Sequence, residues 1–139
     1  MIHIQFPTPD IAVNHWGELI PFMQLAIDYS NGEVNEETLK QKVSSGEVIL
    51  AVVYDGEVII ATVAFEMIFF DTGKKAVNIQ LAGGDRVDEW YHHIIDIADY
   101  IAKERGADDV YIIGRPGWQR KLKQFGFELV HTVLHKGVK

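Results

Sequence analysis

The 139-residue chain contains no cysteine. Disulfides, thiolate nucleophiles and cysteine-based zinc sites are therefore excluded. A reducing compartment suits such a chain, although a secreted protein can also lack cysteine. No apolar run approaches the length of a membrane span, and the N-terminus lacks the basic and apolar regions of a signal peptide. We therefore expect a cytoplasmic protein without a membrane partner.

Basic residues are also scarce. Lysine and arginine total 13 against 20 aspartates and glutamates, and the formal net charge is −7. Non-specific nucleic-acid binding depends on cationic side chains that meet phosphates, so this balance argues against a general nucleic-acid binder. Near the C-terminus, where Glu128 is the sole acid, the basic residues gather at Arg115, Arg120, Lys121, Lys123, Lys136 and Lys139. This clustering leaves a local anion site open.

Metal-ligand spacing is missing as well, despite six histidines. His92 and His93 are adjacent, so a helix directs them about 100° apart. His131 and His135 would share one face of a strand, but roughly 13 Å apart, which is too far to hold one zinc ion. We therefore predict no metal site.

What is present is an ordinary globular balance, with 47% hydrophobic and 24% charged residues. Together with the length, this predicts one domain over residues 1–139 with a real core. Residues 1–6 alternate as a strand does, and a helical region runs from an Asp10 cap to about residue 29, with Pro21 as a kink or a second start. A helix over 36–44 follows, capped by Asn35.

The second half begins with the clearest local signal, two β-branched runs around Asp55-Gly56, which predicts a hairpin. After a turn at 71–75, residues 76–82 complete an antiparallel meander. Helices over 85–105 and 115–125 then alternate with strands over 108–114 and 127–137. The strand–helix–strand order predicts a parallel crossover. The fold class is therefore α/β (α+β), with a mixed, mostly antiparallel sheet and helices on both faces.

Two stretches carry a resemblance to a known family. One is the strand, glycine pair and helix over 80–105; the other is KLKQFGFELV, over 121–130. With the element order, they resemble the GNAT superfamily of N-acetyltransferases over nearly the whole chain. GRPGW at 114–118, followed by a basic helix and FGF, is similar to short phage-encoded GNAT-like proteins.

The resemblance implies acetyl-CoA or CoA as the cofactor and no metal. In that family the loop after the fourth strand binds the pyrophosphate, with the pattern Gln or Arg, two residues, Gly, one residue, then Gly or Ala. Gln80 and Gly83 match this pattern and Asp85 departs from it. The implied cofactor residues are Leu81, Ala82, Gly83, Gly84 and Asp85, with Arg115 and Arg120 as aids.

Asp85 leaves two interpretations open. Glycines before a helix N-terminus allow phosphate to approach free amides and the positive end of the helix dipole. However, Asp85, Asp88 and Glu89 place negative charge there, and two like charges about 4 Å apart repel by roughly 4 kcal/mol before screening. Asp85 is also a good helix N-cap. The stretch is thus either a phosphate loop or a capped helix after a Gly-Gly turn.

The family's catalytic residues provide a second test of whether this chain resembles an active acetyltransferase. Many members place a tyrosine, which protonates the CoA thiolate, four residues before the glycine of the Gly-Phe pair; here that position is Leu122. The family's glutamate base on the fourth strand has no counterpart in residues 76–82. Glu66 on the preceding strand, or Tyr111 on the next, is the substitute that the sequence offers.

Two functional hypotheses follow. We favour a GNAT-fold protein with a degenerate pyrophosphate loop, weakly active or non-catalytic. Such a protein would bind another protein or serve as a phage-type accessory or virion protein, in the host cytoplasm or the virion. The alternative is an acetyl-CoA-dependent N-acetyltransferase acting on a primary amine of a small molecule or protein. The sequence does not indicate an oligomeric state.

Overall fold

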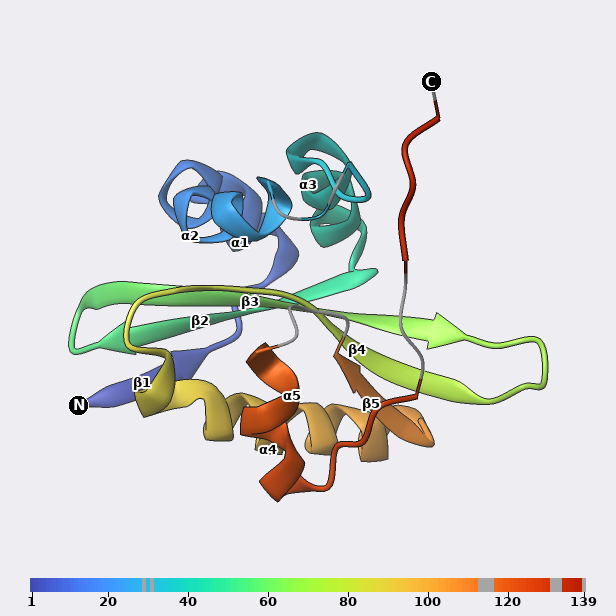
Figure 1. Cartoon of the computed structure of the whole chain (residues 1–139). Helices are drawn as coiled ribbons and strands as arrows, with labels where there is room; N and C mark the ends of the chain where they lie inside the picture. The colour runs from blue at the N-terminus through green and yellow to red at the C-terminus, as the bar shows by residue number, and fades with distance from the viewer. Residues whose placement is uncertain (29, 31, 113–116, 131–133, 139) are drawn as a thin grey trace.

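The computed structural model describes residues 1–28, 30, 32–112, 117–130 and 134–138, with the backbone alone for 117–119. Its elements follow in the order β1 (Ile2–Gln5), α1 (Pro9–Asn14), α2 (Trp16–Asp28), α3 (Glu36–Ser45), β2 (Val48–Asp55), β3 (Val58–Phe69), β4 (Lys75–Gly84), α4 (Val87–Arg105), β5 (Asp109–Ile112), α5 (Gly117–Leu122) and the 3-10 turn η1 (Lys123–Phe125). The sheet forms a central layer between α1–α3 on one face and α4 and α5 on the other (Figure 1).

The five strands lie in chain order, β1-β2-β3-β4-β5. The first four pair antiparallel, and β4 pairs parallel with β5. The α4 helix connects the parallel pair, as the strand–helix–strand order predicts. The predicted α+β class, with a mixed sheet covered on both faces, is therefore confirmed.

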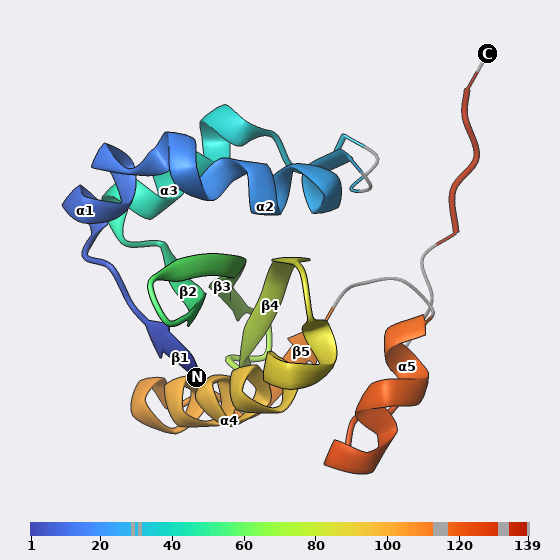
Figure 2. The same cartoon turned by 90° about the vertical axis from the view of Figure 1, so that its left-hand side faces the viewer.

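Each face of the sheet has its own apolar core, because strand side chains alternate between the two faces. The core under α1–α3 is centred on Met23 and Leu39, which are fully or almost fully buried. The core under α4 is centred on Phe65 and Trp90, each 1% exposed. Figure 2 shows α1–α3 and α4 on opposite sides of the strands.

Two local predictions in the first half are displaced. The first helix begins at Pro9 under a Thr8 cap instead of at Asp10, and the chain breaks at His15, whose amide bonds back to the Ile11 carbonyl. Pro21 lies inside α2. The hairpin loop is Gly56-Glu57, since Asp55 pairs with Val58 at the end of the strands.

The predicted last strand over 127–137 is wrong for its described residues. Neither 127–130 nor 134–138 is a strand. Leu129 is 62% and Leu134 89% exposed, and Figure 2 shows the end of the chain standing away from the sheet. The apolar, β-branched composition favours a strand, but a strand also needs a neighbour to pair with, and composition does not supply one.

The predicted Gly-Gly turn is not a loop, because both glycines belong to β4. β4 continues through both glycines, with Gly83 opposite Thr62 and Gly84 opposite Ala61. A Cβ on Gly83 would lie 2.0 Å from the backbone oxygen of Phe22 in α2. Gly84 has φ of +137°, which favours glycine. The crossing of α2 over β4 thus explains the glycine at position 83, and the positive φ explains the glycine at position 84.

This contact gives a stability prediction. Gly83→Ala forces a methyl group against the backbone of α2, and we expect a loss of roughly 1–3 kcal/mol in the free energy of unfolding, measured with urea. Gly17→Ala is the matched control, because Gly17 lies in α2 with open space around its Cα. It should be neutral or stabilising by up to about 1 kcal/mol. Equal effects of the two substitutions would contradict the packing explanation.

Candidate functional site

The site lies where β4 leaves β5. Among the described residues, pairing between these strands covers Ala76 to Ile79 of β4 and Asp109 to Ile112 of β5. Beyond it, residues 80–84 pair only with β3 within the described part of the chain. Gln80 is the extra residue of a bulge, since Ile79 lies opposite Phe65 and Leu81 opposite Ala64. A bulge bends its strand and increases the local twist, which suits a strand that diverges from its neighbour.

The α4 helix begins beside this open stretch, but Asp85 is not its cap. The helix starts at Val87, and Arg86 is the N-cap residue without a side-chain cap bond. The Asp85 amide donates to the Ile60 carbonyl at 2.9 Å, and the Asp85 carbonyl accepts from Trp90 Nε1 at 2.7 Å. The predicted cap is therefore wrong, because Asp85 extends the contact with β3 by one residue. Its amide is also not free for a phosphate.

Arg86 organises the charges at the start of α4. It is the one non-glycine residue with positive φ, 59°, within the described ranges. Its guanidinium donates to Glu89 at 2.5 and 2.8 Å and to Asp55 at 2.7 Å. Hydrogen bonds from the Met1 amino group and then Arg86 lower the pKa of Asp55 to about 2. The Arg86 hydrogen bond also lowers the pKa of Glu89, and the two carboxylates raise the pKa of Arg86.

A second ion pair joins α4 to α5. Lys121 Nζ lies 2.5 Å from Asp88 Oδ1 and 5.4 Å from the centre of the Tyr91 ring. Gln124 Nε2 donates to the Tyr91 hydroxyl at 3.1 Å. Two of the three acids that the sequence places here are thus neutralised by ion pairs. Asp85 is left as the acid of this turn without an ion pair to any described residue.

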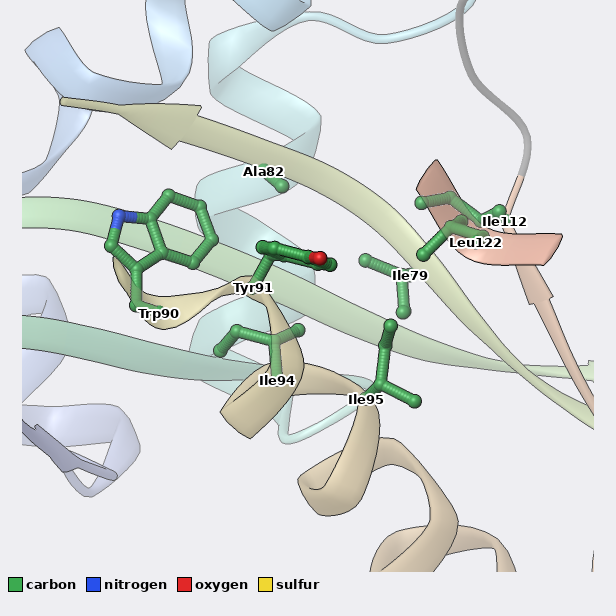
Figure 3. Close-up of a pocket in the computed structure, with 8 residues that line it drawn as sticks. All are labelled: Ile79, Ala82, Trp90, Tyr91, Ile94, Ile95, Ile112 and Leu122. Carbon is green, nitrogen blue, oxygen red and sulfur yellow. The ribbon is translucent and has the colours of Figure 1, made fainter. Parts of the chain in front are cut away.

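An apolar pocket lies between α4, α5 and the sheet. Its lining residues are Ile79, Ala82, Trp90, Tyr91, Ile94, Ile95, Ile112 and Leu122 (Figure 3). Leu122 is 2% exposed among these isoleucines. The position at which the resemblance expects a tyrosine acid therefore serves packing between α5 and the sheet.

The two predicted catalytic residues lie on either side of Asn78. Glu66 of β3 and Tyr111 of β5 are its partners in the neighbouring strands. Asn78 Nδ2 donates to Glu66 Oε1 at 3.1 Å. The Tyr111 ring packs at a tilt on the Phe70 ring, with 5.6 Å between centroids. The sheet thus brings Glu66 and Tyr111 into one row.

The predicted cofactor residues do not form a single surface. Leu81 is buried in the core under α1–α3, whereas Ala82 packs against the core under α4. Gly84 is exposed at the end of β4. Arg120 is exposed on α5 and makes no ion pair to another described residue. Arg115 lies outside the described residues.

Three side chains of the site were not predicted from the sequence: Arg86, Asn78 and Lys121. The signal for Arg86 is its charge, opposite to that of Glu89 three residues later at a helix start. Asn78 was visible as a lone amide in an apolar strand. Lys121 appeared only as part of a basic cluster, because its partner Asp88 is 33 residues away.

Solved acetyltransferases share this architecture. A predicted acetyltransferase from Clostridium acetobutylicum, solved with acetyl-CoA, is 16% identical, with a TM-score of 0.73 over 99% of this chain and 96% of that chain. For glucosamine-6-phosphate N-acetyltransferase from Arabidopsis thaliana the identity is 14%, the TM-score 0.67 and the coverage 100% and 99%. For ribosomal-protein-alanine N-acetyltransferase from Brucella melitensis these values are 14%, 0.66, 99% and 100%.

The chain has the GNAT fold. No protein-family model and no curated protein matches the sequence. Likeness at these identities establishes the GNAT fold and leaves the activity to the site. Among the described residues, no helix has the length and apolar character to cross a bilayer, and no group of three or more potential ligands is placed to hold a metal ion.

The residues at the open end of β4 fit the acetyl-CoA that a GNAT fold implies in two respects. The first-turn amides of Val87 and Asp88 have no intrahelical acceptor and suit a pyrophosphate. The side of residues 80–84 that pairs with no described strand suits an extended chain that adds to the sheet. A Cβ at Gly83 would meet the Phe22 carbonyl, so packing against α2 by itself accounts for glycine at this position.

The Asp55 contacts give a pH prediction. Because the folded-state pKa of Asp55 is about 2, below its ordinary 3.8, the ionised contact stabilises the fold above about pH 4. This stabilisation disappears as the pH falls towards 2. Asp55→Asn should therefore lower Tm at pH 7 and lower it progressively less between pH 4 and 2. Asp99→Asn, at an exposed position of α4, should show no such dependence. A Tm loss in Asp55→Asn that is constant with pH would count against this account.

Proposed function

We propose that the protein binds acetyl-CoA and is a slow N-acetyltransferase acting on a primary amine. The observation that supports this most is the half of β4 that pairs only with β3 among the described residues, beside the first turn of α4, in a GNAT fold. An extended ligand can add to residues 80–84, and its anionic end then meets the amides of Val87 and Asp88. The ion pairs of Arg86 and Lys121 reduce the negative field that the acids would otherwise impose.

Acetyl-CoA would supply the activated acyl thioester. The chain would hold the amine beside it, and the effective concentration gained this way is itself a large contribution to the rate. Glu66, half-buried and held by Asn78, is the group that would take a proton from the amine. Leu122 has no proton to give to a leaving thiolate, so we expect the transfer to be slow.

A non-catalytic role is the second candidate, and the burial of Leu122 favours it. In that case the same fold binds another protein, as a phage-type accessory or virion protein would. The two candidates differ in one measurable property, because only the first requires acetyl-CoA binding. If a calorimetric titration with acetyl-CoA releases no heat and millimolar acetyl-CoA leaves Tm unchanged, only the non-catalytic candidate remains.

Asp85 should weaken acetyl-CoA binding. Its carboxylate precedes the α4 amides without an ion pair to any described residue, so it repels a pyrophosphate there. We expect Asp85→Asn to tighten the calorimetric Kd about fivefold, equivalent to about 1 kcal/mol. The gain should shrink at high salt, because exposed charges are screened.

Asp99→Asn removes the same charge from an exposed position of α4, about three turns beyond the start of the helix, and is the matched control. It should leave the Kd unchanged. If Asp85→Asn and Asp99→Asn change the Kd equally, only net charge matters and the placement of the anion at the start of α4 is wrong.

A further inference from the structure

A row of side chains crosses β3, β4 and β5 on one face of the sheet. Glu66 lies opposite Asn78, and Asn78 lies opposite Tyr111. Residues opposite each other in a sheet project to the same face. Val48, the β2 partner of Glu66, belongs to the core under α1–α3, so the row lies on that face. We call Glu66, Asn78 and Tyr111 the polar row.

The central residue of the polar row has an unused acceptor. Asn78 is 3% exposed, and its Nδ2 donates to Glu66. Its Oδ1 has no hydrogen-bond partner within the described part of the chain. Gln80 Oε1, two residues along β4, is a second buried oxygen in the same condition. Buried amide oxygens are nearly always hydrogen-bonded, so each calls for an N–H or O–H donor.

The ends of the polar row suit a cation. Glu66 contributes a half-buried carboxylate at one end. At the other end the Tyr111 ring packs on the Phe70 ring, and aromatic faces attract ammonium groups. A carboxylate, an amide oxygen and aromatic rings together match a group that carries several N–H donors and a positive charge.

We propose that the polar row binds the primary ammonium group of the acceptor substrate. Asn78 is the positioning residue: it holds Glu66 by its Nδ2 and accepts one ammonium N–H at its Oδ1. One N–H bond of the ammonium then breaks as its proton forms an O–H bond with the Glu66 carboxylate. The neutral amine keeps the electron pair that acyl transfer needs. The proposal rests on the proposed function and names the part of the site that receives the amine.

The position of the row fits this role. Asn78 lies two residues before the Gln80 bulge, where β4 begins to separate from β5. An acyl group carried along residues 80–84 would therefore end near the row. Glu66 and Tyr111 are half-buried, and the β3–β4 hairpin extends beyond the helices that cover the sheet (Figure 1). The two ends of the row are thus partly open to solvent, with the buried Asn78 between them, next to the proposed cofactor path.

The test uses the full-length protein without acetyl-CoA. Ethylammonium chloride is titrated into ¹⁵N-labelled protein, and tetramethylammonium chloride at equal ionic strength is the control. We expect saturable shifts of the Asn78 side-chain amide and the Tyr111 backbone amide with ethylammonium only, because tetramethylammonium has no N–H. The absence of these shifts, or an equal response to both cations, would overturn the proposal.

Two variants separate this role from a structural one. Asn78→Leu keeps the volume and removes the amide, so ethylammonium binding, followed at Tyr111, should weaken at least tenfold while Tm is unchanged or raised. Thr62→Val is the matched control, since Thr62 is fully buried and its Oγ1 also has no described partner; it should keep the response. If Asn78→Leu does not fold, Glu66→Gln at the half-buried end of the row decides, with the same tenfold loss expected. Unchanged binding in the deciding variant would refute the role.

Acetyl-CoA calorimetry distinguishes this proposal from the proposed function. Asn78→Leu should bind acetyl-CoA as the wild type does. Acetyl-CoA binding without an ammonium response would overturn the amine site alone. An ammonium response without acetyl-CoA binding would support the amine site and overturn the proposed function.

Discussion

The site depends on one change along β4, which, among the described residues, pairs with two strands over its first half and with one strand over its second. Backbone amides and carbonyls that leave a ladder need another partner, so the open side of residues 80–84 favours an extended ligand. The bulge at Gln80 lies at the point of change, and α4 begins where the open stretch ends. The polar row lies at the other end, where β5 is still paired. In the proposed function, the cofactor path and the amine site would therefore be successive segments of one strand.

Charge at the start of α4 has a different meaning in three dimensions from the one it has in the sequence. Asp88 and Glu89 appear to oppose anion binding, but Lys121 and Arg86 pair with them. Arg86 also reaches Asp55 at the β2–β3 turn, which ties the helix start to the sheet. Arg86 also has a left-handed backbone here, a conformation that a non-glycine residue keeps only where its surroundings stabilise it. Asp85 is left as the acid of this turn without an ion pair to a described residue.

Gly83 and Gly84 have two alternative explanations, phosphate binding and backbone packing. A glycine pair after a strand and before a helix is typical of phosphate loops, and this pattern alone predicts a ligand-binding role. Instead, Gly83 admits the backbone of α2 and Gly84 adopts a positive φ. A GNAT fold can therefore keep this glycine pair for packing alone, whether or not the chain binds acetyl-CoA. The burial of Leu122 is a similar case, in which packing replaces the side chain that chemistry would require.

The sequence by itself determined the element order from β1 to α5, the mixed sheet and the parallel crossover, because periodicity and turn residues are local signals. It also placed Glu66 and Tyr111 among the candidates for chemistry. Only the tertiary structure decided that they flank Asn78, that Arg86 and Lys121 neutralise the acids, and that β4 runs through the glycines. It also left the described residues after Phe125 without a strand. These outcomes depend on contacts between residues far apart in the chain, and local patterns carry no information about such partners.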